Sequence, residues 1–225
     1  MNFLCHALPY LDRPILAACT GMPDFLSVID RKIRARGRMA APFLESDDAT
    51  MRDVAGGITS HIRDDRWFHS GETFVRMNLE FAVQLRDLLP GDSGFRPTFV
   101  GHILIEMLLD ANYLVDDRDK VEAYYALFAS LPLAEIEGCV NRITGKPCDK
   151  IASTMERFAD IRFLFDYEHD DTLLMRLNQV MNRVGLAQLP EAVRDWLPEA
   201  RAAVRSNHQR LLTHAGQSES YPALG

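Results

Sequence analysis

Six side chains of types that bind divalent metals fall into two evenly spaced triplets. They are His61, Asp65 and His69, followed by His102, Glu106 and Asp110. Within each triplet the residues are four apart, and on an α-helix a four-residue step turns a side chain by only about 40°. Each triplet is therefore expected to line one face of a helix. Mixed imidazole and carboxylate ligands suit manganese, iron or zinc better than calcium, so the pattern predicts a divalent-metal site.

The second triplet is the more informative because of its apolar surroundings. The segment 98–115 is apolar almost all round, which is typical of a central, buried helix. An unpaired imidazole or carboxylate in such a helix would cost several kcal/mol, whereas one divalent cation can satisfy several of these groups together. A bound metal can activate water and stabilise a phosphoryl oxygen. Arg63 and Arg66, beside the first triplet, are expected to bind that phosphate through their guanidinium groups.

The elements that must position these residues are helices. Strand patterns are scarce, whereas helical spacing of apolar residues recurs along nearly the whole chain and predicts an all-α, multi-helix bundle. One helix is expected to begin at Pro14, and the others to cover residues 3–11, 46–69, 74–89, 98–115, 121–130, 133–143, 151–167, 173–184 and 190–214. Gly56 and Gly57 indicate close packing or a break. No repeat or linker divides the chain, so we expect a single domain over 1–214 and a disordered tail over 215–225.

Composition restricts the classes of partner and the location. The 225 residues are 47% hydrophobic and 25% charged, which is ordinary for a globular protein, and the formal net charge of −7 argues against non-specific nucleic-acid binding. The four cysteines contain no Cys-x-x-Cys pair, and we expect them to be reduced and mostly buried. No apolar run approaches the roughly 20 residues that span a membrane, and the start lacks a secretory pattern. We therefore expect a cytoplasmic protein without a membrane partner.

Three short segments in the first half of the chain resemble a known family. They are Asn2-Phe3-Leu4-Cys5-His6, Gly21-Met22-Pro23-Asp24-Phe25 and Gly57-Ile58-Thr59-Ser60-His61-Ile62-Arg63-Asp64-Asp65. In order and spacing they are similar to the Asn-Phe-Leu-Ala-His start, the Gly-Asn-x-x-x-Asp-Phe loop and the Gly-Ile-x-x-His-Arg-x-Ile-Asp segment of the acyl carrier protein phosphodiesterase family. These proteins are helical metal-dependent hydrolases, distantly related to the HD-domain phosphohydrolases.

The resemblance implies an HD-like helical fold and a manganese-type site near Asp24, His61 and Asp65. Asp24 would be both a metal ligand and a catalytic residue, and His6 would lie close by and contact the substrate. The implied reaction is phosphodiester hydrolysis that releases phosphopantetheine from holo acyl carrier protein. The implied partner is therefore acyl carrier protein or another acidic protein.

The chain departs from the family's pattern on the later helix. Gly101-His102 stands where the family carries an Asp-His pair, and His69 stands where an Asp is common. Either Glu106 or Asp110 is expected to supply the missing carboxylate.

Two alternatives remain from the sequence. In the first, the polar triplets are solvated faces with local ion pairs of small energetic value, and the protein is a non-catalytic helical binding protein with a degenerate metal site. Five of the eight residues in segment 31–38 are basic, which fits either an exposed loop or a docking site for an acidic partner or a substrate phosphate. In the second, the chain is another helical metalloenzyme, such as a di-iron oxidase. The absence of a Glu-x-x-His motif weighs against that alternative.

Overall fold

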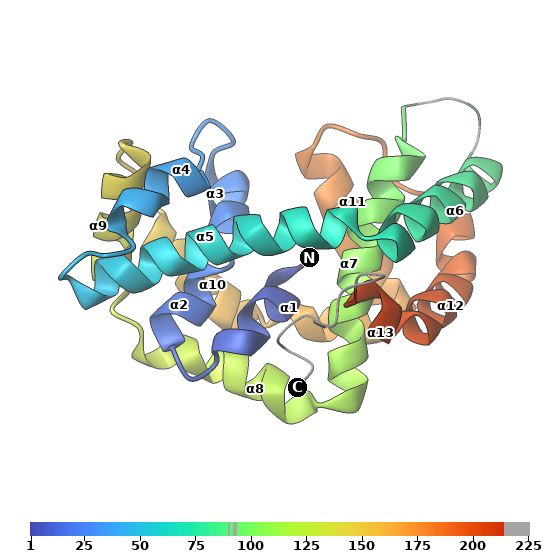
Figure 1. Cartoon of the computed structure of the whole chain (residues 1–225). Coiled ribbons are helices and arrows are strands. Elements are labelled where there is room, and N and C mark those ends of the chain that lie inside the picture. The colour runs from blue at the N-terminus through green and yellow to red at the C-terminus, as the bar shows by residue number, and fades with distance from the viewer. Residues whose placement is uncertain (90, 92–93, 214–225) are drawn as a thin grey trace. The chain divides into compact units, whose positions relative to one another are not determined.

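The computed structural model of the chain describes residues 1–89, 91 and 94–213. These residues form 13 α-helices and 4 short 3-10 helices, and within them there is no β-strand (Figure 1). The prediction of an all-α, multi-helix protein is therefore confirmed. Likeness to HD-domain proteins stays a prediction, and the expected tail at 215–225 lies outside the described residues.

The chain divides into two compact units, and neither is a continuous stretch of sequence. The first combines Met1–Arg66 with Asp117–Arg162, and the second combines Trp67–Asp116 with the described part of 163–225. The chain therefore passes from one unit to the other three times. The prediction of a single domain stays a prediction, and each unit is described below by itself.

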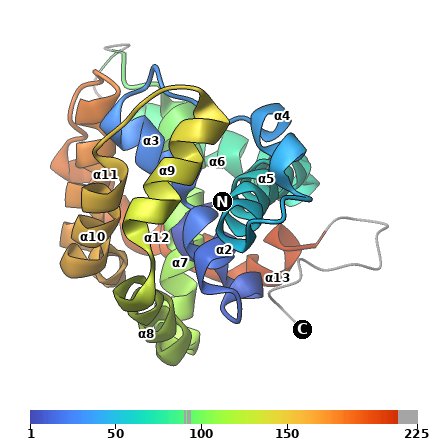
Figure 2. The same cartoon turned by 90° about the vertical axis from the view of Figure 1, so that its left-hand side faces the viewer.

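The first unit is built from eight α-helices, one of which ends in the second unit. They are α1 (Phe3–Ala7), α2 (Pro14–Cys19), α3 (Met22–Ile29), α4 (Gly37–Ala40), α5 (Ala49–Ser70, of which 49–66 belong here), α8 (Arg118–Leu127), α9 (Leu133–Thr144) and α10 (Ile151–Ile161). In Figures 1 and 2, α9 lies beside both α4 and α10. Phe158 of α10 is the centre of the core. Five rings lie around it with centroids 5.0 to 5.9 Å away, those of Phe3, Phe25, Tyr124, Tyr125 and Phe128.

Helix α5 approaches α2 closely at its glycine pair. Asp48 caps the start of α5, because its Oδ1 accepts a hydrogen bond of 3.1 Å from the backbone N–H of Met51. A Cβ atom at Gly57 would lie 2.7 Å from the backbone carbon and the Cβ of Cys19, and equally close to the carbonyl oxygen of Leu16. The helix continues through the pair, so the glycines mark close packing and not a break.

Replacing Gly57 by Ala should destabilise the protein by about 2 kcal/mol, because the added methyl group meets backbone atoms that cannot move independently. A suitable control is Gly138→Ala in α9, where a Cβ would meet nothing within 4 Å. That substitution should stabilise the protein by up to about 1 kcal/mol, since Ala favours a helix over Gly. Urea unfolding of both variants checks the prediction, and a stabilised Gly57→Ala protein would contradict it.

The second unit is organised around one long helix. Its α-helices are α6 (Glu72–Leu88), α7 (Pro97–Asp116), α11 (Asp170–Arg183), α12 (Glu191–Ser206) and α13 (His208–Leu211), and a 3-10 helix, η4, covers Phe163–Glu168. Helix α7 packs against α6, α11, α12 and η4, which confirms the expectation of a central, buried helix. The expectation that no apolar run approaches the length of a membrane span is wrong for one helix, because among the described residues α7 is long and apolar enough to cross a membrane. However, 67% of its most apolar stretch is buried inside the protein, as in the core helix of a globular domain.

Several helices are shorter than the sequence pattern indicates, and two of them end at a residue with a clear cause. The helix expected over 151–167 ends at Ile161, because Arg162 takes the left-handed conformation (φ 51°) and η4 follows it. The helix expected over 190–214 is divided at Asn207. The Nδ2 of this residue donates a 2.9 Å hydrogen bond to the carbonyl oxygen of Ala203 and so competes with the helical pattern.

Candidate metal centres

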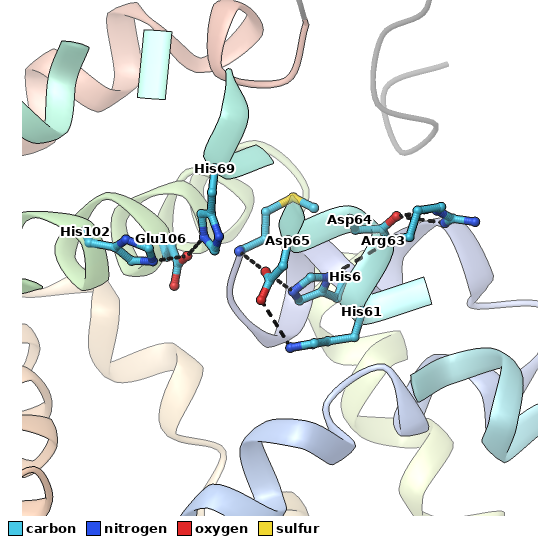
Figure 3. A network of polar contacts seen from close by, with 9 residues as sticks. His6, His61, Arg63, Asp64, Asp65, His69, His102 and Glu106 are labelled. Atoms are coloured by element: carbon cyan, nitrogen blue, oxygen red, sulfur yellow. Dashed lines mark hydrogen bonds and ion pairs between the residues drawn. The ribbon is translucent and has the colours of Figure 1, made fainter. Parts of the chain in front are cut away.

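The first unit holds one cluster of metal-binding side chains, which we call the His6 group: His6, His61 and Asp65. One nitrogen of each histidine and one carboxylate oxygen all lie within 4.8 Å of one another. The Nε2 of His6 is 3.1 Å from Oδ1 of Asp65, and the Nε2 of His61 is 3.3 Å from Oδ2 of the same carboxylate (Figure 3). The two imidazoles therefore direct the same kind of nitrogen at one carboxylate.

Two helices bring these side chains together. Helix α1 carries His6, which is fully buried, and α5 carries His61 and Asp65 one turn apart. The two imidazole rings lie with their centroids 4.2 Å apart and their planes tilted by 31°. Asp65 is partly exposed and also accepts a 2.7 Å hydrogen bond from the amino group of Met1. Solvent therefore reaches the group from the side of its carboxylate.

The charges of the His6 group are strongly coupled. Burial lowers the pKa of His6, but the neighbouring carboxylates of Asp64 and Asp65 outweigh this effect and raise the pKa above its ordinary value. Burial alone would raise the pKa of Asp65, yet His6 and His61 hold it well below the usual range. The same contacts favour the ionised form of Asp65, which a metal needs, and the protonated form of His6, whose proton a metal would have to displace.

Behind His6 lies a chain of polar contacts that the sequence pattern does not reveal. The Nδ1 of His6 has no hydrogen-bond partner among the described residues, but it lies 3.9 Å from Oδ2 of the buried Asp64. Arg63 donates hydrogen bonds to Asp64 Oδ1 (2.8 Å) and to the hydroxyl of Tyr10 (2.7 Å). An outer carboxylate can orient a ligating histidine by accepting from its Nδ1–H while Nε2 binds the metal. Asp64 lies on the Nδ1 side of His6, but at 3.9 Å it makes no hydrogen bond to this nitrogen.

The second unit holds another cluster, the His69 group: His69, His102 and Glu106. Both Nε2 atoms converge on Oε1 of Glu106, at 2.7 Å from His69 and 3.1 Å from His102 (Figure 3). The histidine side chains are 30% and 31% exposed and that of Glu106 is 11% exposed, so this group is more open than the His6 group. The ring of Phe74 packs against both imidazoles, with centroids 5.1 and 5.0 Å away.

The His69 group also keeps its carboxylate ionised. Burial would raise the pKa of Glu106, but the hydrogen bonds from His102 and His69 contribute to holding it well below its ordinary value. His69 comes from the last turn of α5, and His102 and Glu106 lie one turn apart on α7. Of the two acids that the sequence offered as a replacement on this helix, Glu106 is the one beside the histidines.

The two groups differ from the two triplets predicted from the sequence. Each group contains a histidine and a carboxylate four apart on one helix, together with a histidine from another helix. Asp24 on α3 and the buried Asp110 on α7 belong to neither group. Arg66 is exposed, while Arg63 is engaged by Asp64 and Tyr10, so that Asp64 lies between Arg63 and His6 (Figure 3). The predicted roles of these four residues stay predictions.

Gly101 shows why an aspartate is missing from the later helix. A Cβ atom there would lie 2.9 Å from Oδ1 of Asn78 and 3.1 Å from Cβ of Phe81, both on α6. The position thus allows close packing of α6 on α7, and a side chain added to it would be directed at α6. The carboxylate beside His102 comes instead from the next turn of α7.

Both groups fit a divalent metal by the chemistry of their donors. Two imidazole nitrogens and one carboxylate oxygen form a ligand set known for zinc and for non-haem iron, and three protein ligands leave positions for water or substrate. The structural alternative is that each group is held together by hydrogen bonds alone, without a metal, since the carboxylate in each group already contacts both histidines. The buried Nδ1 of His6 lacks a hydrogen bond and lies 3.9 Å from Asp64, so ligation at Nε2 would leave its proton directed at that carboxylate.

Comparisons with known proteins leave the chain without a family assignment. No family model, curated protein or solved structure matches it. The likeness to acyl carrier protein phosphodiesterases therefore rests on the three segments of the first half, two of which contribute His6, His61 and Asp65 to one group. The sequence spacing alone missed His6 as a partner of His61. The alternative of local ion pairs among Arg63, Asp64 and Asp65 included the contact of Arg63 with Asp64 that the structure has, but Tyr10 was missed.

Proposed function

We propose that the protein is a metal-dependent hydrolase of phosphoric esters whose catalytic metal is held by His6, His61 and Asp65. The observation that carries the proposal is the convergence of two Nε2 atoms on one ionised, partly exposed carboxylate, with an outer carboxylate behind His6. A divalent metal bound there would supply Lewis acidity and a water molecule of lowered pKa. Manganese is the first choice, with iron and zinc as alternatives.

The residues of the chain would have distinct roles in this reaction. Arg63 holds Asp64 on the Nδ1 side of His6, where this carboxylate would accept the Nδ1 proton once Nε2 binds the metal. The partial exposure of Asp65 gives a phosphate access from that side. Arg66 follows Asp65 on α5 and is exposed. It is better placed than Arg63 to bind the phosphate, since Arg63 already donates to Asp64 and Tyr10.

For the substrate we propose the phosphopantetheine group of holo acyl carrier protein. The three resembling segments support this choice, and so does the basic segment 31–38. In that segment the side chains of Arg34 and Arg36 are exposed while those of Ile33 and Ala35 are buried, so the alternation presents cations outward from an anchored chain. Such a surface can attract an acidic partner.

The proposal is tested by activity of the purified protein with manganese, on bis-para-nitrophenyl phosphate and on holo acyl carrier protein. We expect hydrolysis that is abolished by a chelator, restored by the metal and absent in His61→Ala. A His169→Ala variant, which removes an exposed histidine outside both groups, should retain full activity. Metal binding without any hydrolysis would refute the enzymatic proposal and favour the non-catalytic binding protein.

Changing Asp64 to Asn should weaken metal binding by about 10- to 100-fold, because the outer carboxylate that orients His6 is lost while its volume is kept. Competition with a coloured chelator would measure the affinity. The control is Asp47→Asn, which changes an exposed acid away from the group and should leave the affinity unaltered. Equal affinities in the two variants, with normal helical circular dichroism, would remove Asp64 from the site.

A further inference from the structure

Helix α6 presents a stripe of large apolar side chains to solvent. Val75, Leu79 and Val83 are 45%, 58% and 55% exposed, although the opposite face of the helix packs in the core of the second unit. Their spacing of four residues places them along one narrow face. A contiguous exposed apolar stripe on a folded protein commonly marks a surface that binds another protein.

The two valines and one pair of opposite charges are arranged symmetrically about Leu79. Val75 and Val83 lie four residues before and after it, while Glu72 and Arg86 lie seven residues before and after it. The side chains of Glu72 and Arg86 are both exposed. If two copies of the helix pair antiparallel about a twofold axis at Leu79, each Val75 faces a Val83, and each Glu72 faces an Arg86. A pattern with this property is complementary to itself.

We propose that α6 pairs with α6 of a second copy of the chain, antiparallel, about a twofold axis at Leu79. In this arrangement Leu79 contacts its own equivalent, and Val75 contacts Val83 of the partner subunit. Glu72 faces Arg86 of the partner subunit at each end of the pair.

A second set of ion pairs follows on the flank of the stripe. Arg76 and Glu80 are exposed there and lie 3.7 Å apart within one helix. The twofold axis places Arg76 about two residues, or about 3 Å along the axis, from Glu80 of the partner subunit. Asp87 lies beside Arg86 and reduces the benefit of the end pairs. Because exposed ion pairs contribute little, the apolar stripe must supply most of the binding, and the dimer is expected to be weak and concentration-dependent.

Sedimentation velocity of the whole protein over a wide concentration range tests the pairing. The wild-type protein should pass from monomer to dimer as concentration rises, and Leu79→Glu should stay monomeric throughout. Met175→Glu is the matched control, because Met175 is an exposed apolar residue of α11, 42% exposed, outside the stripe. It should dimerise like the wild type.

Charge reversal distinguishes this geometry from any other use of the stripe. Arg76→Glu and Glu80→Arg should each raise the dissociation constant by roughly tenfold, since each brings like charges together across the axis, and the double variant should recover wild-type affinity. A wild-type protein that is monomeric at every concentration would overturn the proposal. A dimer that survives Leu79→Glu, or no recovery in the double variant, would overturn it as well.

Discussion

Purified protein supplied with manganese should contain about two metal ions per chain, one in each group, because each group offers three converging ligand atoms. His61→Ala should lose the metal of the His6 group, and His102→Ala should lose that of the His69 group. Each variant should therefore hold about one ion, and the double variant none. Elemental analysis after gel filtration measures the metal directly, without any assumption about substrate.

The control for this experiment is His169→Ala, which should retain both metals, since His169 is exposed and lies in neither group. Full loading of both single variants would show that the metal binds elsewhere. No metal in the wild-type protein, under conditions that supply it, would show that the His6 group and the His69 group are held together by hydrogen bonds only. Loss of both ions in a single variant would show that the groups are not independent.

Introducing the aspartate that the family pattern expects, by Gly101→Asp, should destabilise the protein by about 3 kcal/mol or more. The new Cβ would meet Asn78 and Phe81 at 2.9 and 3.1 Å, and the added carboxylate would be buried between α6 and α7. Metal content should not rise, because the position faces α6. Urea unfolding and elemental analysis of the same preparation check both statements.

Gly138→Asp in α9 is the matched control, since a side chain at this helical glycine meets nothing within 4 Å. Its stability should differ from that of the wild type by less than about 0.5 kcal/mol. A stable Gly101→Asp protein that binds additional metal would instead support a site of the family's kind at this position.

The helices were predictable because their causes are local. Apolar spacing placed α5, α6 and α7 close to their observed bounds, and the nearly uniform apolar character of 98–115 identified the central helix. Two short helices, α3 and α4, were not among the expected ones. Other errors lie where a residue ends a helix early. Arg162 in the left-handed region and Asn207 each end a helix that the apolar pattern alone would continue.

The composition of the two groups was only partly predictable. The pairs His61 with Asp65 and His102 with Glu106 follow from spacing along one helix, and the structure has both. The third member of each group depends on which helices pack together, which spacing within a helix does not encode. The resemblance placed His6 close to His61 and Asp65, whereas nothing in the sequence indicated that His69 lies with His102 and Glu106.

The alternation of the chain between the two units bears on how the protein is made on the ribosome. Phe158, whose ring is central to the core of the first unit, is synthesised long after Phe3 and Phe25, with which it packs. When His6, His61 and Asp65 have been synthesised, Phe158 has not, so the core of the first unit cannot yet form. Compact units generally fold as wholes during synthesis, so the first unit cannot complete its fold until residues 67–116 and then 117–162 have been synthesised. The side chains of His6, His61 and Asp65 are therefore exposed to solvent and to chaperones before the packing that brings them together can form.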